Sequence, residues 1–134
     1  MTEPDKVARA NAEAAAQEQL RTELLTSGLY DWVPMIEVTT TIAHYHLAET
    51  LSQQQDLALR TIRSLLDDGL MQIGDLPGPD AKFPAWDLSI NAAMERVYDR
   101  FVSHHDNPIE WEFCIWLGLT EQGEAAAKAL EARS

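Results

Sequence analysis

Four histidines stand in two close pairs, His44 with His46 and His104 with His105, and Asp106 follows the second pair directly. Imidazole and carboxylate groups are ligands that suit zinc or iron. On a helix, however, residues two apart point about 200° apart around the axis, so His44 and His46 cannot both face one ion. We therefore expect no bound metal, with His46 a partly buried polar group and His104 a favourable charge near a helix C-terminus. A site that joins one histidine from each pair remains the alternative.

Cys114 is the single cysteine of the chain. We place it in a strand, facing away from Trp111 and Phe113, and expect a buried structural thiol, because no motif pairs it with a histidine and oxyanion donors. The sequence also has no glycine-rich phosphate loop, no G-x-S-x-G and no H-E-x-x-H. We expect neither enzymatic activity nor a cofactor. A single cysteine forms no intramolecular disulfide, which favours a reducing, cytoplasmic location.

The charge of the chain is strongly acidic: 134 residues include 10 basic and 22 acidic ones, a net charge of −12. Acidic residues outnumber basic ones in each of the segments 1–33, 34–68, 69–119 and 120–134. Because contacts from Lys and Arg to phosphate supply most nucleic-acid affinity, this balance disfavours nucleic-acid binding. A local patch of Arg60, Arg63 and Lys82 is the alternative that would allow it.

The distribution of apolar residues disfavours two further classes, membrane-spanning proteins and secreted proteins. No apolar run approaches the roughly 20 residues that a membrane span needs. The first residues carry no basic region followed by an apolar stretch, so no secretory signal is expected. We therefore expect no membrane contact.

Four tryptophans are many for one small domain. Trp111 and Trp116 fall in a predicted strand at positions that face opposite sides, so one of them lies outside the core. Either the segment from Lys82 to Trp86 covers the outer ring, or that ring anchors a protein partner. Acidic residues around these rings would steer a basic partner. The candidate partner-binding residues are Trp86, Asp87, Asp99, Asp106, Glu110 and Trp111.

Helices are expected to form most of the chain. An Ala-, Glu- and Leu-rich helix spans Pro4 to Thr26 and ends at Ser27-Gly28, where glycine adopts the left-handed conformation. A second helix begins at Asp31, with Pro34 in its first turn and Met35, Val38, Ile42 and His46 on one face. The third opens with a capping box of Ser52 and Gln55 and ends at Gly69. The fourth is capped by Asp87 or Ser89, and the last by Thr120; the apolar stripe of the fourth contains Ile90, Met94, Val97, Tyr98 and Phe101.

Two strands complete the prediction, one from Leu70 to Leu76 and one from Trp111 to Leu117. The fold class is therefore mainly α with a small β-hairpin (α+β). One core is expected to contain Leu59, Ile62, Leu66, Met94, Phe101 and Ile115. Residues 1–28 form an N-terminal helix and residues 29–134 the main domain. The alanine-rich half of the first helix buries little by itself, so we expect the terminal helices to mediate homodimerisation.

This order of elements resembles the winged helix-turn-helix. The junction LLDDGL leads from the third helix into the first strand, and Leu119-Thr120-Glu121-Gln122-Gly123 is similar to the L-T-x-x-G with which MarR-like and PadR-like regulators leave their wing. The resemblance covers about Asp31 to Arg133 and implies a winged-helix fold. The segments Asp31-Trp32-Val33-Pro34, Gly74-Asp75-Leu76, Trp86-Asp87-Leu88 and Trp116-Leu117 are similar to small uncharacterised actinobacterial proteins, a similarity that implies no activity.

The chain departs from a DNA-reading winged helix in two respects. The segment between the predicted strands, Pro77 to Glu110, is long and contains a helix, so the wing is enlarged. The helix that would read DNA offers only Arg60 and Arg63, against Asp56, Asp67 and Asp68. The sequence thus favours a non-enzymatic, acidic module that binds a basic protein, as an immunity protein or antitoxin does. The alternative is a dimeric transcriptional regulator that reads DNA with the helix from Ala58 to Leu66.

Overall fold

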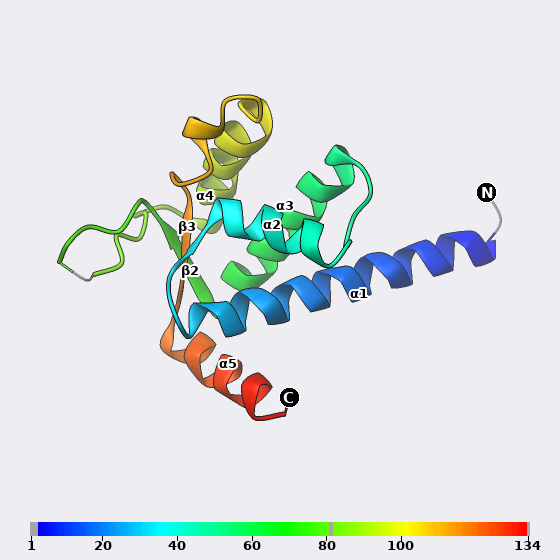
Figure 1. Ribbon diagram of the computed structural model, residues 1–134, viewed down its shortest axis with the longest axis horizontal. Helices are drawn as coiled ribbons and strands as arrows, with labels where there is room; N and C mark the ends of the chain where they lie inside the picture. Colours follow the sequence, from blue (N-terminus) through cyan, green and yellow to red (C-terminus); the bar gives the residue numbers. More distant parts are fainter. Residues whose placement is uncertain (1–2, 81, 134) are drawn as a thin grey trace.

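The computed structural model describes residues 3–80 and 82–133, with side chains from Lys6 onward. The predicted fold class, mainly helical with a small β component, is confirmed in this part of the chain (Figure 1). Two short helical segments, a π-helix at Tyr98–Ser103 and a 3₁₀ turn at Pro108–Glu110, follow α4. The α-helices are α1 (Glu3–Gly28), α2 (Met35–His44), α3 (Leu51–Asp67), α4 (Ile90–Val97) and α5 (Glu121–Arg133); the strands are β1 (Val33–Pro34), β2 (Met71–Gly74) and β3 (Trp116–Leu119).

The strands form one antiparallel sheet in the order β1-β3-β2. Ile73 of β2 and Val33 of β1 both pair with Leu117 of β3, one on each side. The pairing of β2 with β3 was expected from the sequence. Strand β1 was not, because it has only two residues and forms by pairing with a strand more than 80 positions away along the chain.

The predicted strand from Trp111 to Leu117 is wrong over most of its length. Pro108 begins a 3₁₀ turn, and its carbonyl oxygen accepts hydrogen bonds from the N–H groups of Trp111 and Glu112. Trp111 and Phe113, two of the aromatic residues that indicated a strand, therefore lie in consecutive turns. Strand β3 begins only at Trp116 and extends to Leu119.

The core lies between α1, α2, α3, the π-helix and the sheet. Four of the six predicted core residues, Ile62, Leu66, Phe101 and Ile115, are buried. Leu59 and Met94 are half-buried and pack against them. The stripe predicted for the fourth helix is correct at Val97 and Phe101, but Tyr98 is 53% exposed. The second half of α1 belongs to the same core through Leu20, Leu24 and Leu25.

The helix ends follow the predicted chemistry but not always at the predicted residue. The capping box of α3 uses Thr50 and Gln53 in place of Ser52 and Gln55. Pro34, and not Asp31, is the N-cap of α2, while the Asp31 carboxylate accepts a hydrogen bond from the Trp32 N–H. Ser89 and Thr120 cap α4 and α5 as expected, each accepting a backbone N–H.

Glycine acts differently at three of these ends. Gly69 has the predicted left-handed backbone, with φ of 70°. Gly28 ends α1 without adopting a positive φ, contrary to the prediction. Gly123 of α5 instead permits close packing, because a Cβ there would lie 1.8 Å from the Leu70 carbonyl oxygen. This contact holds α5 against the start of β2.

The first half of α1 extends away from the rest of the molecule (Figure 1). Every residue from Lys6 to Ala15 is exposed. The second half of α1 lies beside α5, where Ala127 is fully buried. The two terminal helices thus pack on each other within one chain. We refer to residues 6–15 as the arm.

Candidate functional site

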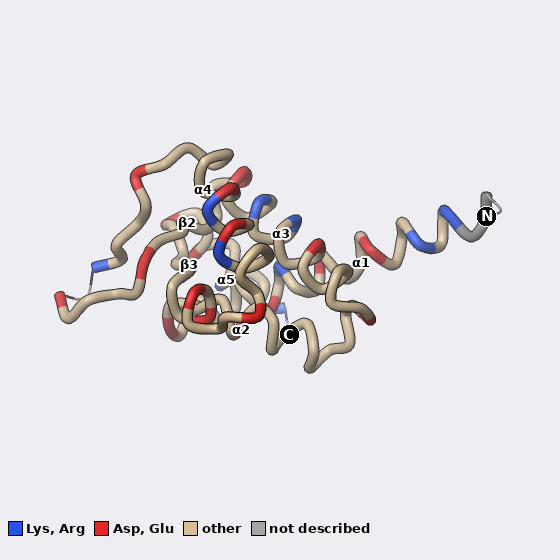
Figure 2. The backbone as a smooth tube through the Cα atoms, turned by 90° about the horizontal axis from the view of Figure 1, so that it is seen from above, with Lys and Arg blue, Asp and Glu red and all other residues tan. Residues whose placement is uncertain are grey.

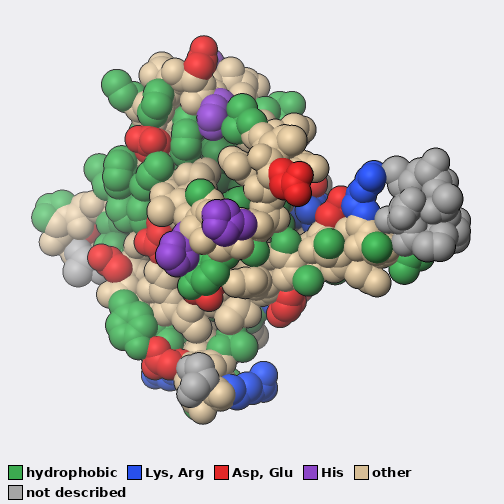
Figure 3. All heavy atoms as spheres, turned by 45° about the vertical axis from the view of Figure 1, so that its right-hand side comes forward, with side chains coloured by type: hydrophobic (Ala, Val, Ile, Leu, Met, Phe, Trp, Pro, Cys, Tyr) green, Lys and Arg blue, Asp and Glu red, His purple; other side chains and the backbone are tan. Residues whose placement is uncertain are grey.

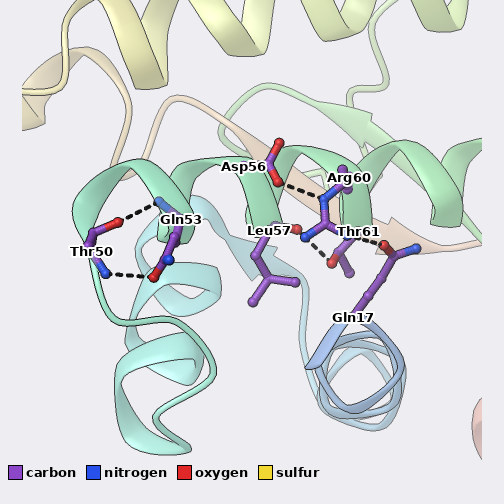
Figure 4. A network of polar contacts seen from close by, with 7 residues as sticks. All are labelled: Gln17, Thr50, Gln53, Asp56, Leu57, Arg60 and Thr61. Carbon is purple, nitrogen blue, oxygen red and sulfur yellow. Dashed lines mark hydrogen bonds and ion pairs between the residues drawn. The ribbon is translucent and has the colours of Figure 1, made fainter. Parts of the chain in front are cut away.

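The arginines of α3 are engaged by neighbouring side chains. The Arg60 guanidinium donates to the Asp56 carboxylate and to the Gln17 side-chain oxygen of α1, each at 2.8 Å (Figure 4). Arg63 donates to Asn91 at the start of α4 and lies 3.8 Å from the Asp67 carboxylate. Arg60 therefore links α3 to α1, and Arg63 links α3 to α4. These are the two groups that a DNA-reading helix would need free.

Lys82, the third candidate for DNA contact, is exposed in the segment that connects β2 with α4. Its backbone N–H donates to the Asp80 carboxylate. Acidic positions occur on every α-helix, as Figure 2 shows, so the described basic residues have carboxylates nearby along the chain.

The histidines do not converge. Among the residues that the structure describes, no three His, Cys, Asp or Glu side chains group together to hold a metal ion. His46 is exposed and lies beyond the end of α2, so its predicted place on the buried face of that helix is wrong. His105 is half-buried and stacks on the Trp111 ring, with centroids 5.2 Å apart.

Cys114 differs from the expected buried strand thiol. It lies in the turn before β3, is half-buried, and its Sγ donates to the Ile109 carbonyl oxygen at 3.1 Å. Residues 108–114 form turns and not the predicted strand, so the predicted position of Cys114 within a strand is wrong for the same reason.

Trp86 packs on its own chain. The guanidinium groups of Arg96 and Arg100 lie 4.7 Å and 5.3 Å from the ring centroid, a cation–π geometry. The indole N–H donates to the Asp75 carboxylate at 2.8 Å. Arg100 also donates to the Cys114 carbonyl oxygen at 2.8 Å. Trp86 thus joins the end of β2, α4 and the turn before β3.

Phe83 from the same connecting segment contacts Trp32 edge-to-face, with centroids 5.8 Å apart. A Cβ at Gly118 would lie 2.9 Å from the Phe83 ring, so this ring covers the sheet there. The segment from Lys82 to Trp86 therefore covers part of the sheet, but the tryptophan that it contacts is Trp32 and not Trp111 or Trp116, the two for which a cover was expected.

Trp111 is only 5% exposed. Its ring contacts Phe101 edge-to-face at 5.1 Å, and its indole N–H donates to the His105 carbonyl oxygen at 3.0 Å. A partner cannot reach this ring directly, so its contribution is to support the turns around it.

Three of the candidate carboxylates contribute to a raised pKa of the exposed His104 side chain. The pKa of His104 is raised above its usual value, first by a hydrogen bond from its ring to the Asp99 carbonyl oxygen and further by the negative charges of Asp99, Glu110 and Asp106. The ring nitrogen lies 2.8 Å from that carbonyl oxygen. Asp87, the fourth candidate carboxylate, is exposed but is not among the groups that raise this pKa. The Asp99 carboxylate lies 3.9 Å from the His104 ring nitrogen, and Asp106 and Glu110 are exposed in the segment that follows.

Beside these carboxylates lie apolar side chains that the sequence did not single out. Ile109 is 85% exposed and Phe113 is 53% exposed. The Phe113 ring contacts the half-buried Trp116 ring, with centroids 6.2 Å apart. Pro108, directly before Ile109, was a usable signal, since proline disfavours a strand interior and begins a turn here. The strand prediction concealed it by placing Phe113 on the same face as Trp111. We call Ile109, Phe113 and Trp116 the apolar row.

Neither a family model, a curated protein nor a solved structure matches this chain. In the described part of the chain no helix is both long and apolar enough to span a membrane.

Proposed function

We propose that this protein is a non-enzymatic, acidic protein-binding module that binds a basic protein, as an immunity protein or antitoxin does. The observation that carries the proposal is the acidic surface around His104, where the Asp99 carboxylate lies 3.9 Å from the exposed imidazole and Asp106 and Glu110 are exposed in the segment that follows. In a chain of net charge −12, this surface attracts basic proteins and repels phosphate. Figure 3 supports this view, because the basic side chains on the face it shows lie mostly near the two chain ends.

We also propose that the protein has a winged-helix fold. The order α1, β1, α2, α3, β2, β3, α5 and the strand order β1-β3-β2 support it. The wing is enlarged, because α4, the π-helix and the 3₁₀ turn all lie between Gly74 and Trp116. The acidic surface around His104 belongs to this enlarged wing.

The DNA-reading alternative takes second place because Arg60 and Arg63 are held by Gln17, Asp56, Asp67 and Asn91. A cytoplasmic location is part of the proposal and is supported by the single cysteine. Homodimerisation through the terminal helices is also part of it, with the arm as the contact surface, since every residue of the arm is exposed within one chain.

Two measurements test the proposal together. In the first, mixed-sequence DNA is titrated at low salt and followed by gel shift, where even a non-specific DNA binder retards. We expect no retardation. In the second, the tagged protein is exposed to extract of its native cell, and bound proteins are eluted with salt and identified. We expect a basic protein whose purified form binds directly and with salt-sensitive affinity. Retarded DNA, or a captured protein that is not basic, would overturn the proposal.

A further inference from the structure

We infer that the apolar row of Ile109, Phe113 and Trp116 is where the basic partner docks, and that the partner's contacting segment carries apolar side chains flanked by Lys or Arg. This inference rests on the proposed function and adds to it the surface and the chemistry of the partner. It also replaces Trp86 and Trp111 as the expected anchors, because these two rings pack within the chain.

Two side chains of the apolar row, Ile109 and Phe113, are exposed to solvent. Of the large apolar side chains that the structure describes, Ile109 has the largest exposed fraction, 85%. Single exposed apolar residues are common on protein surfaces and need no explanation. Here Phe113, which is 53% exposed, lies four positions further on in the same run of turns, and its ring contacts Trp116. The apolar row therefore comes from one short segment of the chain.

The backbone that carries the row is held firmly, which distinguishes it from a loop tip. The Ile109 carbonyl oxygen accepts the Cys114 thiol, and the Cys114 carbonyl oxygen accepts Arg100. The Glu112 and Ile115 carbonyl oxygens accept the first two N–H groups of α2. Beneath the turns, the buried Trp111 ring packs on Phe101. A surface ordered in this way loses little conformational freedom on binding, so contacts with it contribute more to affinity.

The charges beside the row select the partner. Glu110 and Glu112 alternate along the chain with Ile109, Trp111 and Phe113, and the exposed Asp106 precedes Ile109 by three positions. An interface of this type has apolar anchors at its centre and a charged rim. A rim of carboxylates is complementary to Lys and Arg, and it opposes pairing with a second copy of this acidic chain.

The test uses the full chain and two synthetic peptides of equal length and charge, one alternating Lys with Leu and one alternating Lys with Ser. Binding is followed by backbone amide NMR shifts and by calorimetry. We expect the Lys-Leu peptide to bind more tightly and to shift amides of residues 109–116. In the double variant Ile109→Ser/Phe113→Ser, its affinity should fall by about tenfold or more, as for loss of an anchor. Both side chains are exposed, so the variant should fold, which the NMR spectrum reports directly.

Control variants separate the effect of the apolar row from the effect of losing any exposed apolar side chain or any two negative charges. Leu76→Ser removes an apolar side chain that is 61% exposed and lies outside the row, and it should leave the affinity within twofold. Asp106→Asn/Glu110→Gln should weaken binding of both peptides. Glu13→Gln/Glu18→Gln, which removes the same charge from α1, should weaken them less.

The outcomes distinguish the inference from the proposed function. If the wild type binds neither peptide at low salt, attraction to basic partners fails and both are overturned. If the wild type binds but the shifts lie elsewhere, or the double variant binds equally well, only the docking site is wrong. If amides 109–116 shift with protein concentration before peptide is added, the row is an interface between copies, which also overturns the inference.

Discussion

His46 is, among the described residues, the one non-glycine position with a left-handed backbone, at φ of 53°. It follows α2 directly, where its N–H donates to the Ala43 carbonyl oxygen and the Leu47 N–H donates to that of Ile42. This is the pattern of a helix end that usually employs glycine. A histidine side chain there is strained, whereas glycine adopts the same conformation freely.

We predict that His46→Gly raises the free energy of unfolding by about 1 kcal/mol, the cost of a left-handed conformation in a residue with a Cβ. The measurement is urea denaturation. The control is His44→Gly at the last helical position of α2, which should lower the free energy of unfolding by up to about 1 kcal/mol. If both variants lose stability equally, the backbone of His46 is not strained.

We predict that the pKa of His104 lies above the usual value of a histidine side chain. Because its folded pKa is raised, protonation is favoured in the folded state. The stabilisation is fully present below the unfolded pKa of about 6.5 and is lost as pH rises through the folded pKa. An NMR titration of the wild type should give a pKa above 6.5. Asp106→Asn/Glu110→Gln should shift it downward but not remove the effect of the Asp99 carbonyl oxygen. An unchanged pKa would show that these carboxylates do not act on His104.

The candidate site could be predicted from sequence only in part. The acidic residues Asp99, Asp106 and Glu110 were identified because charge needs no knowledge of backbone direction. The exposed side chains of Ile109 and Phe113 were not, because assigning a side to Trp111 and Phe113 requires the local backbone, and Trp116 was named only as one of two rings that could lie outside the core. In the predicted strand these two share a face; in the turns that follow Pro108, Trp111 is buried and Phe113 is exposed.

At the scale of elements, α3 connects α1 with α4 through the side chains of Arg60 and Arg63. Its buried face was predictable because the apolar spacing from Ala58 to Leu66 is long and regular, whereas its first residue was not. Both Thr50-x-x-Gln53 and Ser52-x-x-Gln55 satisfy the capping-box pattern, and the structure employs the first. Patterns that occur twice within a few residues do not fix a boundary, so packing against the rest of the chain decides.

Leu66 tests the core-facing side of α3. It is 8% exposed, and Leu66→Ala should lower the free energy of unfolding by about 2–5 kcal/mol through lost burial and the cavity that remains. Leu51→Ala at the start of the same helix, where the side chain is 51% exposed, should cost less than about 0.5 kcal/mol. Thermal or urea unfolding measures both. Equal losses would mean that Leu66 is not part of the core.

At the scale of the whole molecule, charge opposes compactness. With 22 acidic and 10 basic residues, repulsive pairs outnumber attractive ones, although Arg21 and Asp68 and a few other pairs attract. Salt shortens the Debye length from about 30 Å at 0.01 M to about 8 Å at 0.15 M and screens this repulsion. We predict that the free energy of unfolding rises with NaCl over this range. A fall with salt would mean that the ion pairs dominate.

The arm gives the last prediction, which concerns assembly. Residues 6–15 are exposed, whereas Leu20, Leu24 and Leu25 belong to the core. A chain that begins at Ala16 should therefore fold with nearly unchanged stability, while one that begins at Ser27 should not, because it lacks those leucines and the surface on which α5 packs. Sedimentation then tests the dimer: the full-length chain should be dimeric and the chain from Ala16 monomeric. Because arm-to-arm contact is the only dimerisation surface proposed, an identical oligomeric state for the two folded chains would eliminate the arm as the site of self-association.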